Sequence, residues 1–128
     1  MHSLILVALA AAVFPTLIYA QQSPSLLGKW SGTMSTAGGG ELAVELSLSE
    51  TAGTWRFVPK GSQGRNNPCL GKDFPVVVTT QSATELKFEV LGASVIQGCI
   101  NAAAVLNLIE GKSLEGSLAD GRIVKLAR

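Results

Sequence analysis

Alternation of apolar and polar residues with a period of two recurs in four segments of this 128-residue chain. In residues 41–49 (ELAVELSLS), the three leucines and the valine share one face, whereas acidic and small residues share the other. Residues 84–90, 114–118 and 122–126 repeat the pattern. Because side chains alternate between the two faces of a strand, this period predicts half-buried β-strands.

Four further segments, residues 26–34, 53–59, 74–80 and 104–110, also have strand character. About eight short strands therefore follow one another with turn residues between them, and no segment has the pattern of an ordinary helix. Residues 92–103 are ambiguous and could contain a helical turn. An open meander would leave two sheet edges unpaired. We therefore predict an all-β domain, an antiparallel meander of about eight strands closing into a small barrel, with a two-sheet sandwich as the alternative.

Asp120-Gly121 separates the last two of these segments. A two-residue type I′ turn needs a positive φ at both central residues, and Asp-Gly is one of the pairs that meet this need. We expect the last two strands to form a tight antiparallel hairpin around this turn.

The start of the chain has a different character, because residues 1–20 contain no Lys, Arg, Asp or Glu. The apolar run 3–20 (SLILVALAAAVFPTLIYA) is followed at once by polar residues, which is typical of a signal peptide. We expect residues 1–20 to be removed, residues 21–25 to form a short polar leader and residues 26–128 to form a single domain. An uncleaved membrane anchor is the alternative, but Pro15 and the lack of flanking basic residues disfavour it. The mature protein is then secreted or periplasmic and free of the membrane.

Cys69 and Cys99 are the only cysteines. In an exported chain such a pair is typical of one disulfide. A metal or redox site is less favoured, because the chain has no C-x-x-C motif and no histidine beyond the predicted signal peptide. Cys69 lies in the longest predicted connection, residues 60–72, and Cys99 lies in another long connection. The disulfide would therefore fix two loops against each other.

Basic and amide side chains in and around the connection 60–72 are the candidate ligand-binding or partner-binding residues. They are Arg56, Arg65, Asn66, Asn67 and Lys72. Guanidinium and amide groups recognise carboxylates, sugars or a partner's backbone through directed hydrogen bonds. A solvated loop in which Asn66-Asn67-Pro68 only makes a turn is the alternative interpretation. Trp55 could supply an interface contact, although a Trp in this strand pattern is more typical of a core.

The segment Leu27-Gly28-Lys29-Trp30, followed by Ser31-Gly32-Thr33, resembles the G-x-W signature of the calycin-type small β-barrels, the lipocalins and avidins. In those families the Trp opens the first strand and packs across the closed end of the barrel. The resemblance therefore implies that Trp30 is a core plug. Two departures limit what the resemblance implies. The mature domain is shorter than an ordinary lipocalin. It also has no Tyr and only two Trp, Trp30 and Trp55, whereas avidins line their vitamin pocket with several Trp and Tyr. Biotin binding is not implied.

The residue types available disfavour catalysis. His2 is the only histidine and lies in the predicted signal peptide, so the mature chain lacks an imidazole for a catalytic triad or a metal. Acidic pairs such as Glu41 and Glu45 alternate with apolar residues, which is typical of solvated strand faces. Glycine-rich nucleotide-binding motifs are absent from the sequence, and a net charge of +1 with dispersed basic residues disfavours nucleic-acid binding.

Elimination therefore favours an exported, non-enzymatic binding module without cofactor or metal. It would recognise a small ligand or a protein partner through loops at one end of the barrel, and an inhibitor is one form of this hypothesis. A structural or envelope-associated protein without a specific ligand is the alternative, and an enzyme using carboxylates is a third hypothesis. The interior discriminates between them: a filled barrel leaves recognition to the loops, whereas an apolar cavity favours a small ligand. The oligomeric state stays open.

Overall fold

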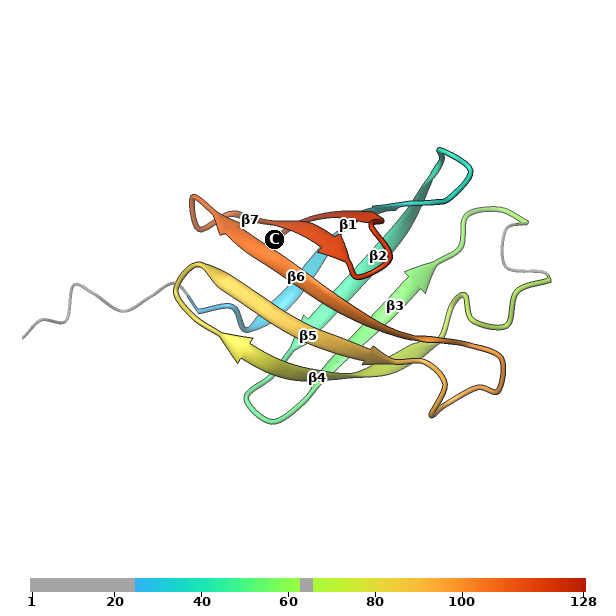
Figure 1. Ribbon diagram of the computed structural model, residues 1–128, viewed down its shortest axis with the longest axis horizontal. Helices are drawn as coiled ribbons and strands as arrows, with labels where there is room; N and C mark the ends of the chain where they lie inside the picture. The colour runs from blue at the N-terminus through green and yellow to red at the C-terminus, as the bar shows by residue number, and fades with distance from the viewer. Residues whose placement is uncertain (1–24, 63–65) are drawn as a thin grey trace, which may run out of the picture.

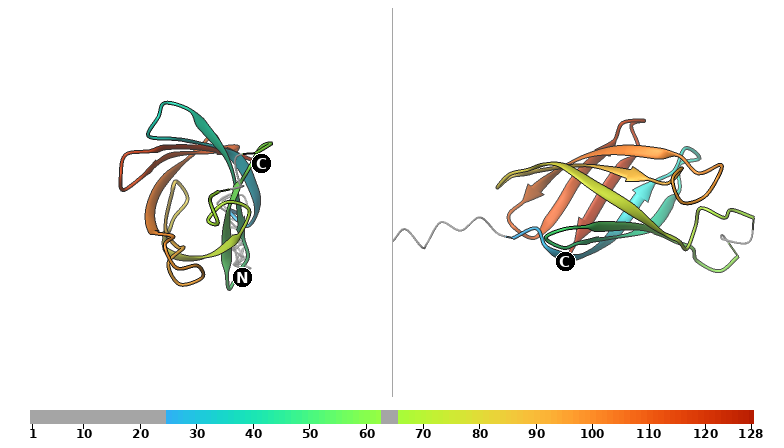
Figure 2. Two further views of the ribbon diagram at one scale, coloured as in Figure 1. Left: turned by 90° about the vertical axis from the view of Figure 1, so that its right-hand side faces the viewer. Right: turned by 90° about the horizontal axis from the view of Figure 1, so that it is seen from below.

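A computed structural model describes residues 25–62 and 66–128. The regular secondary structure of these residues consists of β-strands alone. Eight strands pair in sequence order, each antiparallel to the next, and the first pairs with the last to close a barrel (Figure 1). Seen end-on, the strands form a ring (Figure 2). The predicted all-β meander and its closure into a barrel are confirmed. The strands are β1 (Gly28–Ser35), β2 (Glu41–Leu48), β3 (Gly53–Val58), β4 (Asp73–Gln81), β5 (Glu85–Leu91), β6 (Asn101–Ile109), β7 (Ser113–Leu118) and β8 (Ile123–Ala127).

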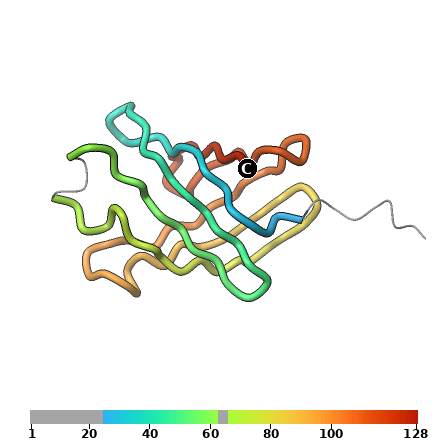
Figure 3. The backbone as a smooth tube through the Cα atoms, turned by 180° about the vertical axis from the view of Figure 1, so that it is seen from behind, coloured from blue at the N-terminus to red at the C-terminus, as the bar shows by residue number. Residues whose placement is uncertain are grey.

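Because the strand direction alternates, the connections divide between the two ends of the barrel. One end, which we call the open end, carries the connections 36–40, 59–72, 92–100 and 119–122. Figure 3 shows the first three of these connections projecting on the same side of the barrel. The opposite end, which we call the closed end, carries the three remaining connections and residues 25–27. The ambiguous segment 92–103 divides into turns over 92–100 and the start of β6.

Trp30 lies near the start of β1, on the side of the closed end, and is only 1% exposed. Its indole Nε1–H donates a hydrogen bond to the carbonyl of Leu26, with 2.9 Å between N and O. The guanidinium carbon of Arg128 lies 4.3 Å from the centre of the Trp30 ring, in a cation–π contact, and Arg128 also donates to the carbonyl of Ser25. Both ends of the described chain therefore meet at this ring.

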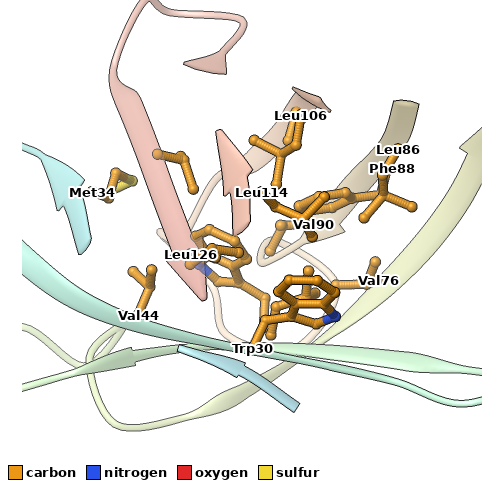
Figure 4. Close-up of a cluster of buried hydrophobic side chains, with 14 of the residues drawn as sticks. Trp30, Met34, Val44, Val76, Leu86, Phe88, Val90, Leu106, Leu114 and Leu126 are labelled. Carbon is orange, nitrogen blue, oxygen red and sulfur yellow. The ribbon is translucent and has the colours of Figure 1, made fainter. Parts of the chain in front are cut away.

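Buried apolar side chains from all eight strands form the core. Figure 4 shows Trp30, Leu114 and Leu126 among them. Each buried position alternates with an exposed or half-buried one: in β8, Val124 and Leu126 are buried, whereas their neighbours along the strand are exposed. The alternation that the sequence analysis used therefore corresponds to the inner and outer faces of the barrel. Trp55 belongs to this core and is 0% exposed.

The predicted hairpin between β7 and β8 is confirmed, but the predicted turn type, I′, is wrong. Gly121 has a φ of 93°, whereas Asp120 is not among the described residues with positive φ. The N–H of Gly121 donates to the carbonyl of Leu118 at 2.9 Å, which leaves a three-residue loop with its glycine in the left-handed region. The Asp120 carboxylate accepts the N–H of Arg122 at 3.1 Å, which is an Asx-type turn contact.

The paired positive φ values occur one hairpin earlier, between β6 and β7. Glu110 has a φ of 51° and Gly111 a φ of 70°, the combination that a type I′ turn requires. The N–H of Lys112 donates to the carbonyl of Ile109 at 3.0 Å and closes this turn.

Candidate functional site

An apolar cavity of about 210 Å³ lies inside the open end of the barrel. Strand residues with inward-facing side chains make most of its wall, and the 59–72, 92–100 and 119–122 connections supply the rest. In an antiparallel barrel, the last inward position of one strand and the first inward position of the next meet at the same end, so these side chains gather at one rim. The strand residues are Met34, Leu42, Trp55, Phe57, Phe74, Val90, Ala102 and Leu118.

The two ends of the barrel differ because of the side chains available to fill them. Next to the closed end, large side chains such as Trp30, Leu114 and Leu126 are at most 2% exposed. At the open end, Ala102 and Gly98 contribute almost no volume to the wall. The barrel is therefore filled through most of its length and hollow at the end where the long loops emerge.

The disulfide between Cys69 and Cys99 forms part of the cavity wall. Its two Cα atoms lie 5.8 Å apart, and it joins the 59–72 connection to the 92–100 connection. The predicted disulfide is thus confirmed, together with its two loops. The neighbouring residues Leu70 and Ile100 continue the wall on either side, so the covalent bond determines how far apart the two loops stand.

The 59–72 connection is also tied back to β3. The N–H of Gly71 donates to the carbonyl of Phe57 at 2.7 Å. The carbonyl of Gly71 in turn accepts a hydrogen bond from Arg56 Nη2 at 3.0 Å. Together with the disulfide, these bonds hold the second half of the connection in place beside the cavity.

The residues predicted for binding are not brought together as one group. Asn67 lines the cavity, and its Oδ1 accepts the N–H of Cys69 at 3.0 Å, which is the turn contact foreseen in the alternative interpretation. Arg56 lies on the outer face and uses its guanidinium on the Gly71 carbonyl. Asn66 and Lys72 are exposed and do not contribute to the cavity wall. Arg65 lies outside the described residues, as do the predicted signal peptide and residues 21–24.

Arg122 lines the cavity although the sequence analysis did not select it. Its Nε donates to Asp120 Oδ2 at 2.7 Å in an ion pair. The strand order could have identified it. In an antiparallel meander every second connection lies at the same end of the barrel, so the β7–β8 turn lies at the same end as the 59–72 connection. The pKa of Asp120 lies below its ordinary value of 3.8, chiefly because the backbone N–H of Arg122 donates to the carboxylate, with the nearby guanidinium acting in the same direction.

We expect the Asp120 carboxyl to titrate below pH 3.8 in a ¹³C NMR titration of the folded protein. Since the folded pKa is depressed, the contribution of this group to stability is complete above the unfolded pKa and is lost as the pH falls through the folded pKa. The contribution is small because the Asp120 side chain is 48% exposed. Arg122→Gln removes the guanidinium but keeps the backbone N–H, so it should retain most of the lowering. A midpoint at or above the ordinary value in the wild type would contradict the turn geometry.

Comparison with known proteins finds no matching family, no matching curated protein and no matching solved structure. The closed eight-stranded barrel is consistent with the architecture implied by the G-x-W resemblance. None of the described segments is a helix long and apolar enough to cross a bilayer. Among the same residues, no three His, Cys, Asp or Glu side chains lie close enough together to hold a metal ion.

Proposed function

We propose that this protein is an exported, non-enzymatic binding module that takes a small ligand into the open end of its barrel. The observation that carries the proposal is the apolar cavity of about 210 Å³ bounded by the disulfide and its two loops. Export is supported by the apolar run before Gln21 and by the disulfide, a bond typical of oxidising compartments.

The size of the cavity limits the ligand. Pockets for drug-sized ligands are roughly 300–1,000 Å³, which is larger than this cavity. An engineered protein cavity of about 150 Å³ binds benzene, so the space here suits a single ring or a short aliphatic chain. The cavity opens among loops rather than through the filled part of the barrel, and the ligand therefore enters from the open end.

Titration of ¹⁵N-labelled protein with single-ring and short-chain molecules tests the proposal. We expect saturable chemical-shift changes confined to the cavity wall. Ala102→Leu fills part of the cavity and should weaken binding by about tenfold or more, because the ligand loses the volume it occupies. Ala103→Leu is the matched control, since Ala103 is exposed on the same strand. Shift changes that never saturate, or that Ala102→Leu leaves intact, would contradict ligand binding in this cavity.

A protein partner is the second candidate, and one observation favours it. Ile100 lines the cavity and is nevertheless 65% exposed, and Val95 in the same connection is 49% exposed. Apolar side chains exposed around a cavity are typical of sites that receive an anchor residue from a partner. Ile100→Asp separates the candidates: it should remove partner binding at the rim, whereas a small molecule enclosed by the cavity loses less affinity.

A further inference from the structure

Trp55 lines the cavity and carries a buried hydrogen-bond donor without a partner among the described residues. Its ring is 0% exposed and lines the cavity, and its Nε1 is a buried side-chain nitrogen without an acceptor among the residues that the structure describes. Trp30 is the natural comparison, because its equally buried Nε1–H donates to the carbonyl of Leu26. The two indoles therefore differ: the Nε1–H of Trp30 has an acceptor, whereas that of Trp55 has none among the described residues.

An unsatisfied buried donor is costly, so its surroundings indicate what could satisfy it. The aromatic neighbours of the Trp55 ring are Phe57 and Phe88, each with its ring centre 5.8 Å away, and neither offers an acceptor oxygen. A trapped water molecule needs two to four polar partners, and a mainly apolar wall provides few. A ligand in the cavity is therefore the best source of an acceptor.

The charges around the cavity indicate that this ligand is neutral. Arg122 is the only charged residue in the described wall, and its Nε is already paired with the Asp120 carboxylate at 2.7 Å. An anion or a cation that enters this apolar space loses its hydration and finds no unpaired opposite charge there, which is unfavourable.

We propose that the ligand is a small uncharged molecule with an apolar body and one acceptor oxygen, a carbonyl or a hydroxyl, which accepts a hydrogen bond from Trp55 Nε1. This inference rests on the proposed function and adds the chemical class of the ligand. The apolar body occupies the space beside Phe57 and Phe74, and the oxygen satisfies the buried Trp55 donor, which has no partner among the described residues.

Three single-ring probes of similar size test the inference by NMR titration. Ethylbenzene has no acceptor, acetophenone has a neutral carbonyl, and benzoate has a charged carboxylate. We expect acetophenone to bind about tenfold more tightly than ethylbenzene, because it gains the hydrogen bond, and benzoate to bind most weakly. Acetophenone should move the indole N–H resonance of Trp55, while that of Trp30 stays in place as an internal control.

Trp55→Phe removes the donor and keeps an aromatic ring in the wall. We expect this variant to lose the preference for acetophenone over ethylbenzene, whatever its affinity for the two probes. An unchanged Trp30 N–H resonance confirms that the variant is folded, and the comparison of probes on the wild-type protein stands without the variant. Equal affinity for acetophenone and ethylbenzene, or preference for benzoate, would overturn the inference and leave the proposed function intact. Failure of all three probes to bind would overturn both.

Discussion

Gly116→Ala should lower the free energy of unfolding by about 3 kcal/mol or more, and Gly32→Ala should have a similar effect. A Cβ atom at position 116 would lie 1.9 Å from the carbonyl oxygen of Val105 on β6, and one at position 32 would lie 1.9 Å from the carbonyl oxygen of Lys125 on β8. The obstacle in each case is backbone, which cannot move aside without separating paired strands. Neither glycine has a positive φ, so lack of space rather than backbone conformation requires glycine at these positions.

Urea unfolding followed by far-UV circular dichroism measures these changes. Gly38→Ala is the control, because a Cβ there has nothing within 4 Å and Gly38 has no positive φ. We expect the control to stay within about 0.5 kcal/mol of the wild type. If Gly116→Ala is no more damaging than Gly38→Ala, then β6 and β7 do not approach each other as closely as the structure has them.

The strands and their order were predictable from the sequence because burial alternates with the same period as the side chains. In β2 and β5 every buried position holds a leucine, a valine or a phenylalanine, and turn residues mark the boundaries of both strands. The ends of strands were less certain: β6 begins at Asn101, inside the segment that the sequence left ambiguous. The role of Gly116 was not visible, because a glycine in an alternating pattern does not reveal which backbone lies beneath it.

The candidate site was predictable only in outline. The cysteine pair identified the two loops and the end of the barrel on which they lie, since a disulfide needs its two Cα atoms within a few ångströms of each other. The cavity itself depends on how much volume each inward side chain leaves unfilled, and this follows from the three-dimensional packing of residues such as Ala102 and Phe74. The partner of the Trp55 donor also depends on packing, so the sequence could place this residue in the core but could not show that its Nε1 is unsatisfied.

Replacing both cysteines by alanine should lower the free energy of unfolding by about 3 to 4 kcal/mol, the chain-entropy contribution expected for a bridge of this length. The sequence separation of the two cysteines is 30 residues, so the bridge removes many open conformations from the unfolded chain. The strands themselves should persist, because both cysteines lie in connections and the eight strand pairings do not depend on the disulfide.

Ligand binding should be lost more completely than the fold. Cys69, Cys99, Leu70 and Ile100 all belong to the cavity wall. The hydrogen bonds of Gly71 hold the 59–72 connection to β3, and those of Ala93 and Ser94 hold only the start of the 92–100 connection to β6 and β5. Without the bridge, the 92–100 connection can move away from the 59–72 connection, and the cavity then loses one side. Under conditions where the double variant is folded, we expect its affinity for acetophenone to fall by about tenfold or more while its far-UV spectrum stays that of the wild type. A double variant that binds as tightly as the wild type would show that the strand residues alone form the site, and that the bridge contributes to stability but not to recognition.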